Sequence, residues 1–373
     1  MYCLKYISTA LLLLSSLAVK AVELPDWLAI SGFASVAAAK SDNDTPYYYT
    51  RNITDDWCFD CDTIVGLQAD IFPTDWLHAS AQLVKRPSDN FSDPDLEWAY
   101  ISVEPIADLK IRAGRLRSPT FMYSQVVFVN QAYPWVRLPA EVYDTTGGFT
   151  RYDGIDGYYT WVLNDSLLLQ LQPYAAFKTS IDDNEINNTY YDVDLKELYG
   201  LRLDLESDVW SVYLNYFEAR LDITTVEDII PVEFNDFGVP IKFGKLSVPI
   251  DSKTWSYGLK YEWQDFTVIF EGTTSKDAPW GGYVSLLYHY HDWTPYIVYG
   301  KRTGGEEGNK DKSDSFSLGA RYDILPNLAA VAEWHYTKAK GDSRGSFTYP
   351  TGQEPDDRSA NIFTLGLNYS FNL

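Results

Sequence analysis

The sequence predicts an all-β fold, a transmembrane up-and-down barrel of about sixteen antiparallel strands. Three observations predict it. Apolar and polar residues alternate along many short segments, the connections between these segments are short and long in turn, and aromatic residues are abundant although no long apolar helix is visible. Together these features favour a sheet with one face against lipid and the other against water.

The alternation is clearest in the C-terminal segment, residues 361–373. Apolar side chains occupy every second position there, at Phe363, Leu365, Leu367, Tyr369, Phe371 and Leu373. Successive side chains of a strand point to opposite faces, so these six share one face. The stretch from Trp255 to Trp263 alternates in the same way and carries an aromatic residue at each end. Aromatic ends of an apolar stripe are typical of the two membrane–water interfaces.

The same pattern upstream predicts sixteen strands, over residues 28–40, 63–72, 76–86, 96–105, 108–117, 153–163, 167–177, 195–206, 209–221, 254–263, 266–274, 282–291, 293–302, 315–325, 328–339 and 361–373. Short connections follow the even strands, at 73–75, 106–107, 164–166, 207–208, 264–265, 292 and 326–327. Long connections follow the odd strands, at 41–62, 87–95, 118–152, 178–194, 222–253, 275–281, 303–314 and 340–360. Outer-membrane barrels have tight turns at one end and loops at the other. An even strand number also lets the sheet close, which leaves no unpaired edge in lipid.

Composition supports a membrane barrel over a large soluble β-protein. The chain has 12 Trp, 29 Tyr and 18 Phe but only two Met, and Trp and Tyr are enriched where a protein crosses membrane interfaces. No run after residue 21 reaches the roughly 18 apolar residues of a spanning helix. A soluble sandwich would also have no reason to sort its connections by parity.

Residues 1–21 match a cleaved secretory signal peptide. Lys5 is followed by an apolar run from Ile7 to Val19 and by small residues near Ala21. We therefore expect one barrel domain over residues 22–373, located in the outer membrane. Removing residues 1–21 takes away two lysines and no acid, so the formal charge moves from −22 to −24. Such a charge argues against nucleic acid as a partner.

Cysteine use is consistent with export. Cys3 belongs to the signal segment, which leaves Cys58 and Cys61 with two residues between them. A local disulfide is the expected state in an oxidising compartment. Two thiolates alone make a poor zinc site, and the Asp-rich surroundings do not favour a redox motif.

A barrel of this strand number encloses water, so its inner wall should be polar and charged. The alternation directs the following residues inward as pore-lining candidates: Gln68, Asp70, Gln82, Arg202, Asp204, Lys260, Glu262, Arg321 and Glu333. Charges that line a constriction set the selectivity of a channel. The other interpretation is that most of them are solvated side chains without a special effect on transport.

The third long connection, residues 118–152, differs from the other loops. It is rich in bulky apolar side chains such as Phe121, Tyr133 and Trp135, which a water-exposed loop would not carry. The nearest enclosed surface is the inside of the barrel, so we expect this loop to fold into the lumen.

At this point the sequence resembles a known family. Residues 132–143 (AYPWVRLPAEVY), with 114–117 (GRLR) before them and 30–36 (ISGFASV) near the start, are similar to segments of a porin-like family of γ-proteobacteria. The chain departs from the porin pattern at its end, because Leu373 stands where porin barrels commonly have an aromatic residue.

The resemblance implies a third loop that narrows the lumen opposite a basic wall, and a homotrimer. Glu141 and Asp144 would form the acidic side. The candidates for the basic wall are Lys110, Arg112, Arg115 and Arg117. Alternatively, Arg137, Glu141 and Asp144 only pin the loop by salt bridges.

The predicted function is passive diffusion of small hydrophilic solutes and ions, without a cofactor, a bound metal or an enzymatic reaction. The predicted partners are these solutes, outer-membrane lipid and lipopolysaccharide. We hypothesise a weak cation preference, because Asp70, Asp204, Glu141 and Asp144 are expected in the lumen. A substrate-specific channel, a plugged barrel receptor or a barrel hydrolase using His289 and His291 are the alternatives.

Overall fold

The computed structural model describes residues 24–48, 51–86, 94–146, 150–186, 189–227, 230–234, 240–276, 280–303, 312–349 and 355–373. The predicted signal peptide lies outside the described residues.

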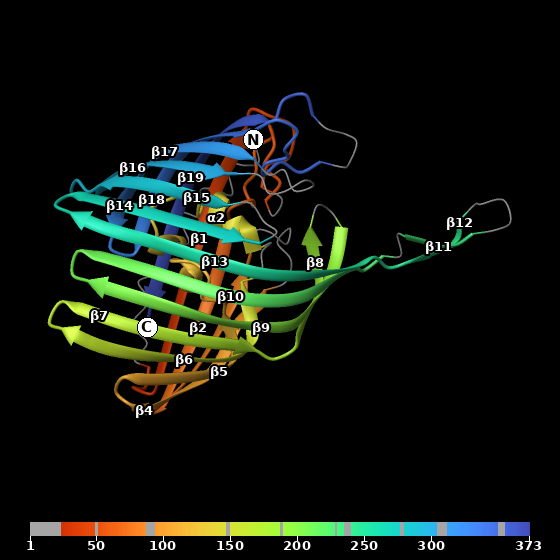
Figure 1. Cartoon of the computed structure of the whole chain (residues 1–373). Helices are drawn as coiled ribbons and strands as arrows, with labels where there is room; N and C mark the ends of the chain where they lie inside the picture. The colour runs from red at the N-terminus through yellow and green to blue at the C-terminus, as the bar shows by residue number, and fades with distance from the viewer. Residues whose placement is uncertain are drawn as a thin grey trace.

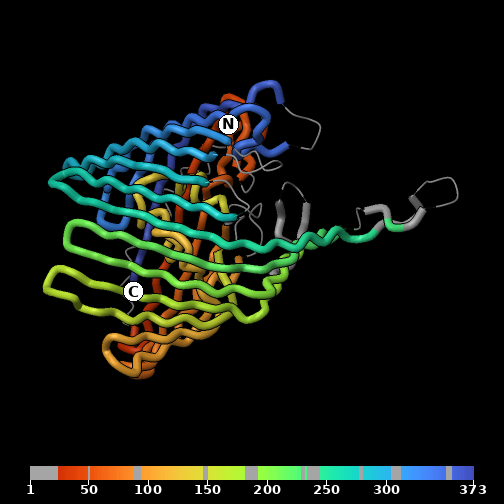
Figure 2. Tube along the Cα trace, in the orientation of Figure 1, coloured from red at the N-terminus to blue at the C-terminus, as the bar shows by residue number. Residues whose placement is uncertain are grey.

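Sixteen strands form one closed antiparallel barrel (Figures 1 and 2), as the sequence predicts. They are β1 (Leu28–Ser41), β2 (Ile64–Thr74), β3 (Leu77–Lys85), β4 (Asp95–Ile106), β5 (Leu109–Arg117), β6 (Arg151–Asn164), β7 (Leu167–Ala176), β9 (Thr189–Ser207), β10 (Trp210–Thr225), β13 (Ser247–Trp263), β14 (Phe266–Ser275), β15 (Gly281–Tyr288), β16 (Trp293–Arg302), β17 (Ser313–Leu325), β18 (Leu328–Ala339) and β19 (Ser359–Asn372).

The barrel closes between its first and last strands. β1 pairs with β19 from Ser31 opposite Asn372 to Ser41 opposite Ile362, and it pairs with β2 on its other side. Every other barrel strand also has a neighbour on each side. The backbone N–H and C=O groups are therefore paired within the sheet, which is the requirement for a sheet in hydrocarbon.

The predicted alternation of connections is confirmed, with one correction. The short turns gather at one end of the barrel and the loops at the other (Figure 1). However, the predicted loops 178–194 and 222–253 contain strands. β8 (Thr179–Ile186) pairs with the first part of β9, and β11 (Ile230–Phe234) pairs with β12 (Pro240–Gly244). β9, β10 and β13 are also longer than expected, because their pairing continues beyond the barrel wall.

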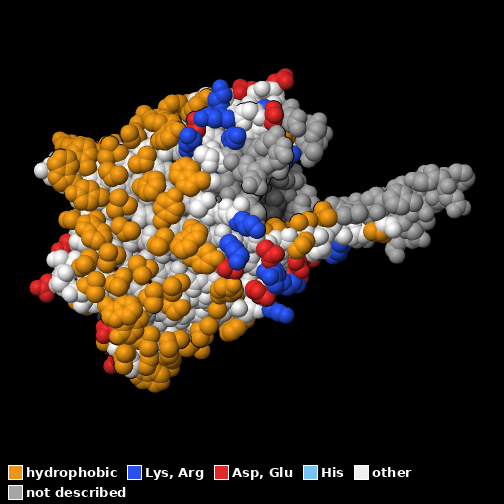
Figure 3. All heavy atoms as spheres, viewed as in Figure 1, with side chains coloured by type: hydrophobic (Ala, Val, Ile, Leu, Met, Phe, Trp, Pro, Cys, Tyr) orange, Lys and Arg blue, Asp and Glu red, His pale blue; other side chains and the backbone are white. Residues whose placement is uncertain are grey.

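The outer face has the pattern of a lipid-facing barrel. Apolar side chains are exposed along its strands, among them Val36, Leu67, Ile101, Ile155, Leu201, Leu259, Ile297 and Leu365. Figure 3 shows hydrophobic side chains covering the strands of the face in view. Exposed aromatic residues lie near both strand ends, with Trp161, Trp263, Phe266 and Trp293 toward the turns and Tyr199, Trp255, Tyr299 and Phe363 toward the loops. Among the described residues, no helix has the length and apolar character needed to cross a membrane.

The third long connection lies inside the barrel. It contains the short helices η2 (Ser124–Val126), η3 (Asn130–Ala132), α2 (Ala140–Tyr143) and η4 (Asp144–Thr146). α2 contacts β14, β15 and β16, and η3 contacts β1 and β19. We call residues 118–146 the inner loop.

Candidate functional site

The inner loop packs against one side of the wall through an apolar cluster. Phe121, Tyr133, Trp135, Leu138 and Val142 of the loop are buried, and so are their wall partners Ile269, Tyr283, Leu287, Tyr296 and Val298. This corrects the expectation of a polar wall all around, since β14, β15 and β16 carry apolar residues on both faces here. The burial of this loop surface excludes water from that side of the lumen.

Trp135 anchors the middle of the inner loop. Its side chain is 1% exposed, and its Nε1 donates a hydrogen bond to Ser285 Oγ at 3.0 Å. Its ring meets the ring of Tyr283 edge to face, with centroids 5.6 Å apart. A buried tryptophan with a satisfied N–H contributes both apolar contact and a fixed position.

Glu271 of β14 binds the inner loop through hydrogen bonds. Its carboxylate is fully buried and accepts four hydrogen bonds, from Met122 N (2.7 Å), Tyr143 Oη (2.8 Å), Tyr213 Oη (2.6 Å) and Tyr283 Oη (2.7 Å). Two donors come from the loop and two from the wall. A buried carboxylate is tolerated where its lone pairs are all used, as they are here.

Arg202 of β9 holds the beginning of the loop by its backbone. Its Nη1 donates to Pro119 O at 3.0 Å and to Phe121 O at 2.7 Å. The same guanidinium pairs with Asp204, two residues along the strand, at 2.7 Å.

Arg321 of β17 repeats this arrangement at the loop's far side. Its Nη1 donates to Gln131 O at 2.9 Å and to Tyr133 O at 3.2 Å, and it pairs with Asp323 at 2.8 Å. Only the planar fork of arginine serves two carbonyl groups and a carboxylate at once. Arg202 and Arg321, both predicted pore-lining residues, thus hold the loop against the wall.

α2 approaches the wall closely because two wall residues are glycines. A Cβ at Gly281 or at Gly300 would collide with Glu141. Glu141 accepts a hydrogen bond from Ser315 Oγ at 2.6 Å, and the guanidinium of Arg302 donates to Ala140 O. Glu141 is therefore fixed against β16 and β17, and it does not face open solvent.

Asp144 follows α2 in the same buried region. Burial raises the pKa of Asp144 to about 6, against the opposing effect of Arg302 and Arg51, and the Glu141 carboxylate raises it further.

A charged pair joins the inner loop to the first long loop. Arg137 donates to both carboxylate oxygens of Asp62, at 2.8 Å and 2.5 Å, and Arg51 also pairs with Asp62. Burial opposes ionisation, but Arg137 and Arg51 together hold the pKa of Asp62 below its ordinary value. This is a pinning role, one of the two interpretations that the sequence left open for Arg137.

The long loop after β1 and the long loop before β19 cover part of the barrel opening at the end that carries the loops. Their side chains form a buried cluster with Ala140 of the inner loop, and its larger members are Tyr47, Tyr48, Ile53, Phe347 and Tyr349. Cys58 and Cys61 are bonded as a disulfide beside this cluster. Cys58, Asp60 and Cys61 lie close enough together to suggest a metal site. Because both sulfur atoms are in the disulfide, this group offers no thiolate to a metal.

A compact group of charges lies on the wall under the loop. Arg117 pairs with Glu97 at 3.0 Å and donates to Gln82 Oε1 at 3.1 Å, and Arg151 also pairs with Glu97 at 3.1 Å. Phe128 of the inner loop covers the Arg117 guanidinium, with the ring centroid 4.8 Å away. Arg117 is thus a buried, compensated charge.

The opposite side of the lumen is open and polar. Arg112 of β5 pairs with Asp156 of β6 at 2.5 Å, and its guanidinium lies over the ring of Tyr158, 4.7 Å from its centroid. Lys110 pairs with Glu104 at 2.7 Å. Arg112 and Lys110 therefore carry compensated charge on the open wall.

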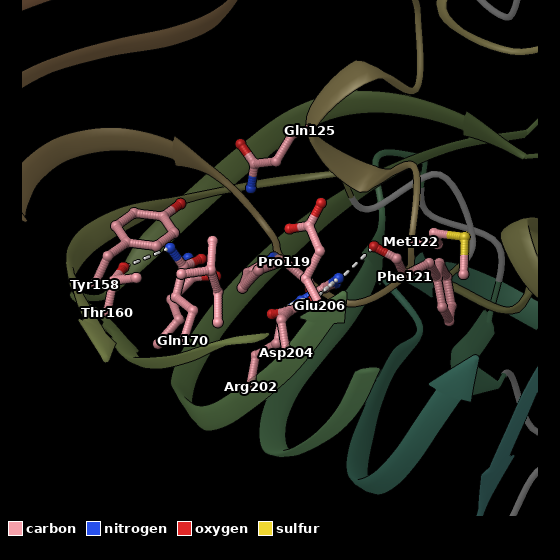
Figure 4. Close-up of a pocket in the computed structure, with 12 residues that line it drawn as sticks. Pro119, Phe121, Met122, Gln125, Tyr158, Thr160, Gln170, Arg202, Asp204 and Glu206 are labelled. Carbon is pink, nitrogen blue, oxygen red and sulfur yellow. Dashed lines mark hydrogen bonds and ion pairs between the residues drawn. The ribbon is translucent and has the colours of Figure 1, made fainter. Parts of the chain in front are cut away.

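Two adjoining cavities lie along this open wall. The smaller, about 210 Å³, separates the inner loop from β6, β7 and β9 (Figure 4), and its lining includes Met122, Gln125, Leu168, Arg202 and Glu206. The larger, about 410 Å³, is lined by Tyr100, Glu104, Ala107, Asp108, Lys110, Arg112, Tyr158, Thr160 and Gln170. Both cavities share Tyr158, Thr160 and Gln170. The two cavities therefore lie on the same part of the wall, from β4 to β9.

The remaining predicted residues lie elsewhere. Gln82, Gln68, Asp70 and His78 form one hydrogen-bond chain on β2 and β3. Three other predicted residues or pairs are separate from that chain. Lys260 pairs with Glu262 at 2.5 Å, and Arg115 pairs with Asp153 at 2.9 Å. Glu333 accepts a hydrogen bond from the Tyr296 hydroxyl at 2.8 Å. Asp153 shares a strand face with the exposed Ile155, so the pair of Arg115 and Asp153 does not face the loop.

Comparisons with known proteins agree on the fold. No protein-family model and no curated protein sequence matches the chain. Among solved structures, an anion-selective porin from Comamonas acidovorans aligns over 92% of this chain and 99% of its own, with 13% identity and a TM-score of 0.58. OmpF of Salmonella typhi, in complex with daunomycin, aligns over 92% and 97%, with 14% identity and a TM-score of 0.56. OmpT, an outer membrane protein of Vibrio cholerae in its trimer form, aligns over 92% and 99%, with 12% identity and a TM-score of 0.56.

The chain has the porin fold. Identities this low establish the architecture alone, and membership of the γ-proteobacterial family stays a prediction.

Sequence reasoning missed several residues of the porin-fold lumen. Glu271, Tyr213 and Tyr283 hold the loop, and Leu168 and Glu206 line the smaller cavity. One available signal was the apolar character of both faces in residues 266–270 and 296–299, which predicts a covered wall. Leu168 and Glu206 give no such signal, because only the pairing register brings them together.

Proposed function

We propose that this chain is an outer-membrane porin, a passive diffusion channel for small hydrophilic solutes and ions. The inner loop forms its constriction by filling one side of the lumen and leaving the other side for transport. The observation that carries this proposal is the pair of adjoining cavities along β4–β9, beside a loop that is held by its backbone. An enclosed polar passage through a closed barrel is what solute diffusion requires.

The constriction that we propose differs from the one the resemblance implied. Glu141 is fixed to Ser315, and Arg117 is buried beneath Phe128. Of the predicted constriction residues, Lys110 and Arg112 line the larger open cavity. We therefore propose that Lys110 and Arg112 act on solutes, while Arg137, Glu141 and Arg117 act on the position of the loop.

The test is the single-channel current of the purified protein in a planar bilayer. We expect reproducible current steps, because the two cavities adjoin and share lining residues. The heat-dependent shift in electrophoretic mobility of a folded barrel is the control for correct folding. A folded barrel that gives no current steps would overturn the channel proposal.

We propose lipopolysaccharide and outer-membrane lipid as the surrounding partners. Lys301 and Lys338 flank Asp314 on neighbouring strands of the outer face, and Lys340 also pairs with Asp314. This lysine row lies beside the aromatic residues at the loop end of the barrel, where the phosphate groups of the outer leaflet are expected. Loss of lipopolysaccharide from the purified protein in the Lys301→Ala/Lys338→Ala variant is the expected result.

We also propose that the chain forms homotrimers, supported by the trimeric OmpT among its structural neighbours. On β1, Ala34 and Val36 share the outer face with Ala38, which offers small side chains for close contact. Chemical cross-linking in detergent should give a trimer band. A monomer alone would contradict this part of the proposal.

A barrel hydrolase is the alternative from another class. Ser102, His78 and Asp70 form a chain of hydrogen bonds, at 3.2 Å and 3.1 Å. However, Ser102 is 1% exposed and the chain continues to Gln68 and Gln82, so we interpret it as a wall network. The imidazole of His289 forms hydrogen bonds with the hydroxyl groups of Thr267 and Thr294. We propose that neither histidine site performs hydrolysis.

A further inference from the structure

We propose that the smaller cavity is a binding subsite for small organic cations. Glu206 holds an ammonium or guanidinium group there, and Leu168 contacts the apolar part of the solute. This inference rests on the proposed channel function, because it assigns a solute class to the open side of the lumen.

The strand register builds this subsite. Leu168 of β7 lies directly opposite Glu206 of β9, and the next inward pairs are Gln170 with Asp204 and Gln172 with Arg202. Directly opposed residues have Cβ atoms about 4.5–5.5 Å apart, so an apolar and an anionic side chain stand side by side. In Figure 4, Glu206 points into the space between the strand wall and Gln125 of the inner loop.

The balance of charge favours a cation. Each cation lining the two cavities is already paired with an acid: Lys110 with Glu104, Arg112 with Asp156, and Arg202 with Asp204. Glu206 and Asp108 also line these cavities, and they form no ion pair with any described residue. A cationic solute meets uncompensated carboxylates, whereas an anionic solute meets only cations that are already neutralised.

Leu168 gives the second part of the recognition. It points inward with Gln170 and Gln172, yet it is 40% exposed. The other apolar residues of this lining come from the inner loop, where Met122 is half-buried and Pro119 lies at the loop's beginning. An alkyl group placed between Leu168 and Met122 removes apolar surface from water on both sides.

The size of the cavity limits the solute. About 210 Å³ is smaller than the roughly 300–1,000 Å³ of pockets for drug-sized ligands. A solute with one charged group and a short alkyl chain therefore fits the dimensions as well as the chemistry.

The experiment is block of the single-channel current by n-butylammonium, compared with n-butanesulfonate and with ammonium. We expect n-butylammonium to block at the lowest concentration and n-butanesulfonate not to block. Glu206→Gln should raise the half-blocking concentration of n-butylammonium about fivefold, the effect of losing one exposed ion pair. Leu168→Ser should raise it about fourfold, the factor for one buried methylene, while leaving the weak effect of ammonium unchanged.

Glu262→Gln is the matched control. Glu262 is an inward acid near the same turn end, but it is paired with Lys260 and lies on β13, away from the cavity. Block by n-butylammonium should be unchanged in this variant. Equal block by the cation and the sulfonate, or an unchanged block in Glu206→Gln, would overturn the subsite.

A direct binding measurement separates this inference from the channel proposal. Saturation-transfer NMR of n-butylammonium with the detergent-solubilised protein detects the subsite without any current. If n-butylammonium binds, Glu206→Gln weakens this binding and the barrel shows no conductance, the subsite is supported and the channel proposal is overturned. Conductance without such binding would overturn the subsite and leave the channel standing.

Discussion

Two glutamates on nearby strands, with only β10 and β13 between them, show how different two inward positions of the barrel can be. Glu271 and Glu206 both sit at inward positions of barrel strands. Glu271 is fully buried, accepts four hydrogen bonds and holds the inner loop. Glu206 is exposed and borders a cavity. The difference teaches that the alternation along a strand sets the direction of a side chain. Whether that side chain then anchors the inner loop or lines a cavity depends on where the inner loop packs.

The largest effect should come from removing the central anchor of the filled side. Trp135→Ala should weaken the packing of the inner loop on the wall by about 3–5 kcal/mol, because a buried indole and its hydrogen bond to Ser285 are lost. We expect strong fluctuation of the single-channel current and faster proteolysis of the inner loop. Trp161→Ala on the outer face is the control, and a quiet current in Trp135→Ala would contradict the assignment of the loop to the wall.

The two arginines that hold loop carbonyls should come next. Arg321→Lys and Arg202→Lys should each weaken the attachment by about 1.5–3 kcal/mol, since an ammonium group cannot serve two carbonyls and a carboxylate together. Current noise should increase in both variants. Only Arg202→Lys should also change the mean conductance, because Arg202 borders the open cavity. The same change of mean conductance in both variants would argue against a one-sided passage.

The glutamate pair tests the comparison directly. Glu271→Gln should lower stability by about 1–3 kcal/mol, because the new amide nitrogen faces donors of hydrogen bonds and leaves them unsatisfied. Glu206→Gln should leave the thermal unfolding midpoint unchanged, since its carboxylate has no ion pair with a described residue. Equal midpoints in the two variants would remove the distinction between the covered position and the open one.

The smallest effect concerns pH and Asp144. Its folded-state pKa of about 6 is above the ordinary value of 3.8, so the folded state binds the proton more tightly than the unfolded state. Stability should therefore increase as pH falls through about 6, and this gain should level off below the ordinary value. The thermal midpoint of the wild type should be higher at pH 5 than at pH 7.5. Asp144→Asn should reduce this difference, and an unreduced difference would assign the effect to other groups.

Much of the fold could be predicted because its determinants are local. Alternation along a strand and tight turns involve residues close in sequence, so the barrel strands and the parity of their connections were found. The extensions of β9, β10 and β13 were missed, since there the pairing continues outside the membrane, where an apolar face is no longer required. The strand predicted at 282–291 ends at Tyr288, because residues 289–292 form the turn to β16.

The candidate site was predictable in part. The bulky side chains of residues 118–152 predicted a packed loop, and the structure places that loop inside the barrel. Arg202 and Arg321 contact the inner loop, but their partners there are backbone carbonyls more than 80 residues away in sequence. No local pattern encodes such a partner.

The sequence by itself determined that the chain forms a closed barrel with a polar interior, because lipid imposes a period of two on every strand. Tertiary structure decided which inward residues are covered. Glu141 and Glu271 became anchors because the inner loop and the wall meet closely at these residues, whereas Glu206 and Asp108 border cavities. The physical reason is that burial and compensation of a charge depend on groups brought together by the fold, while the direction of a side chain depends on its own strand.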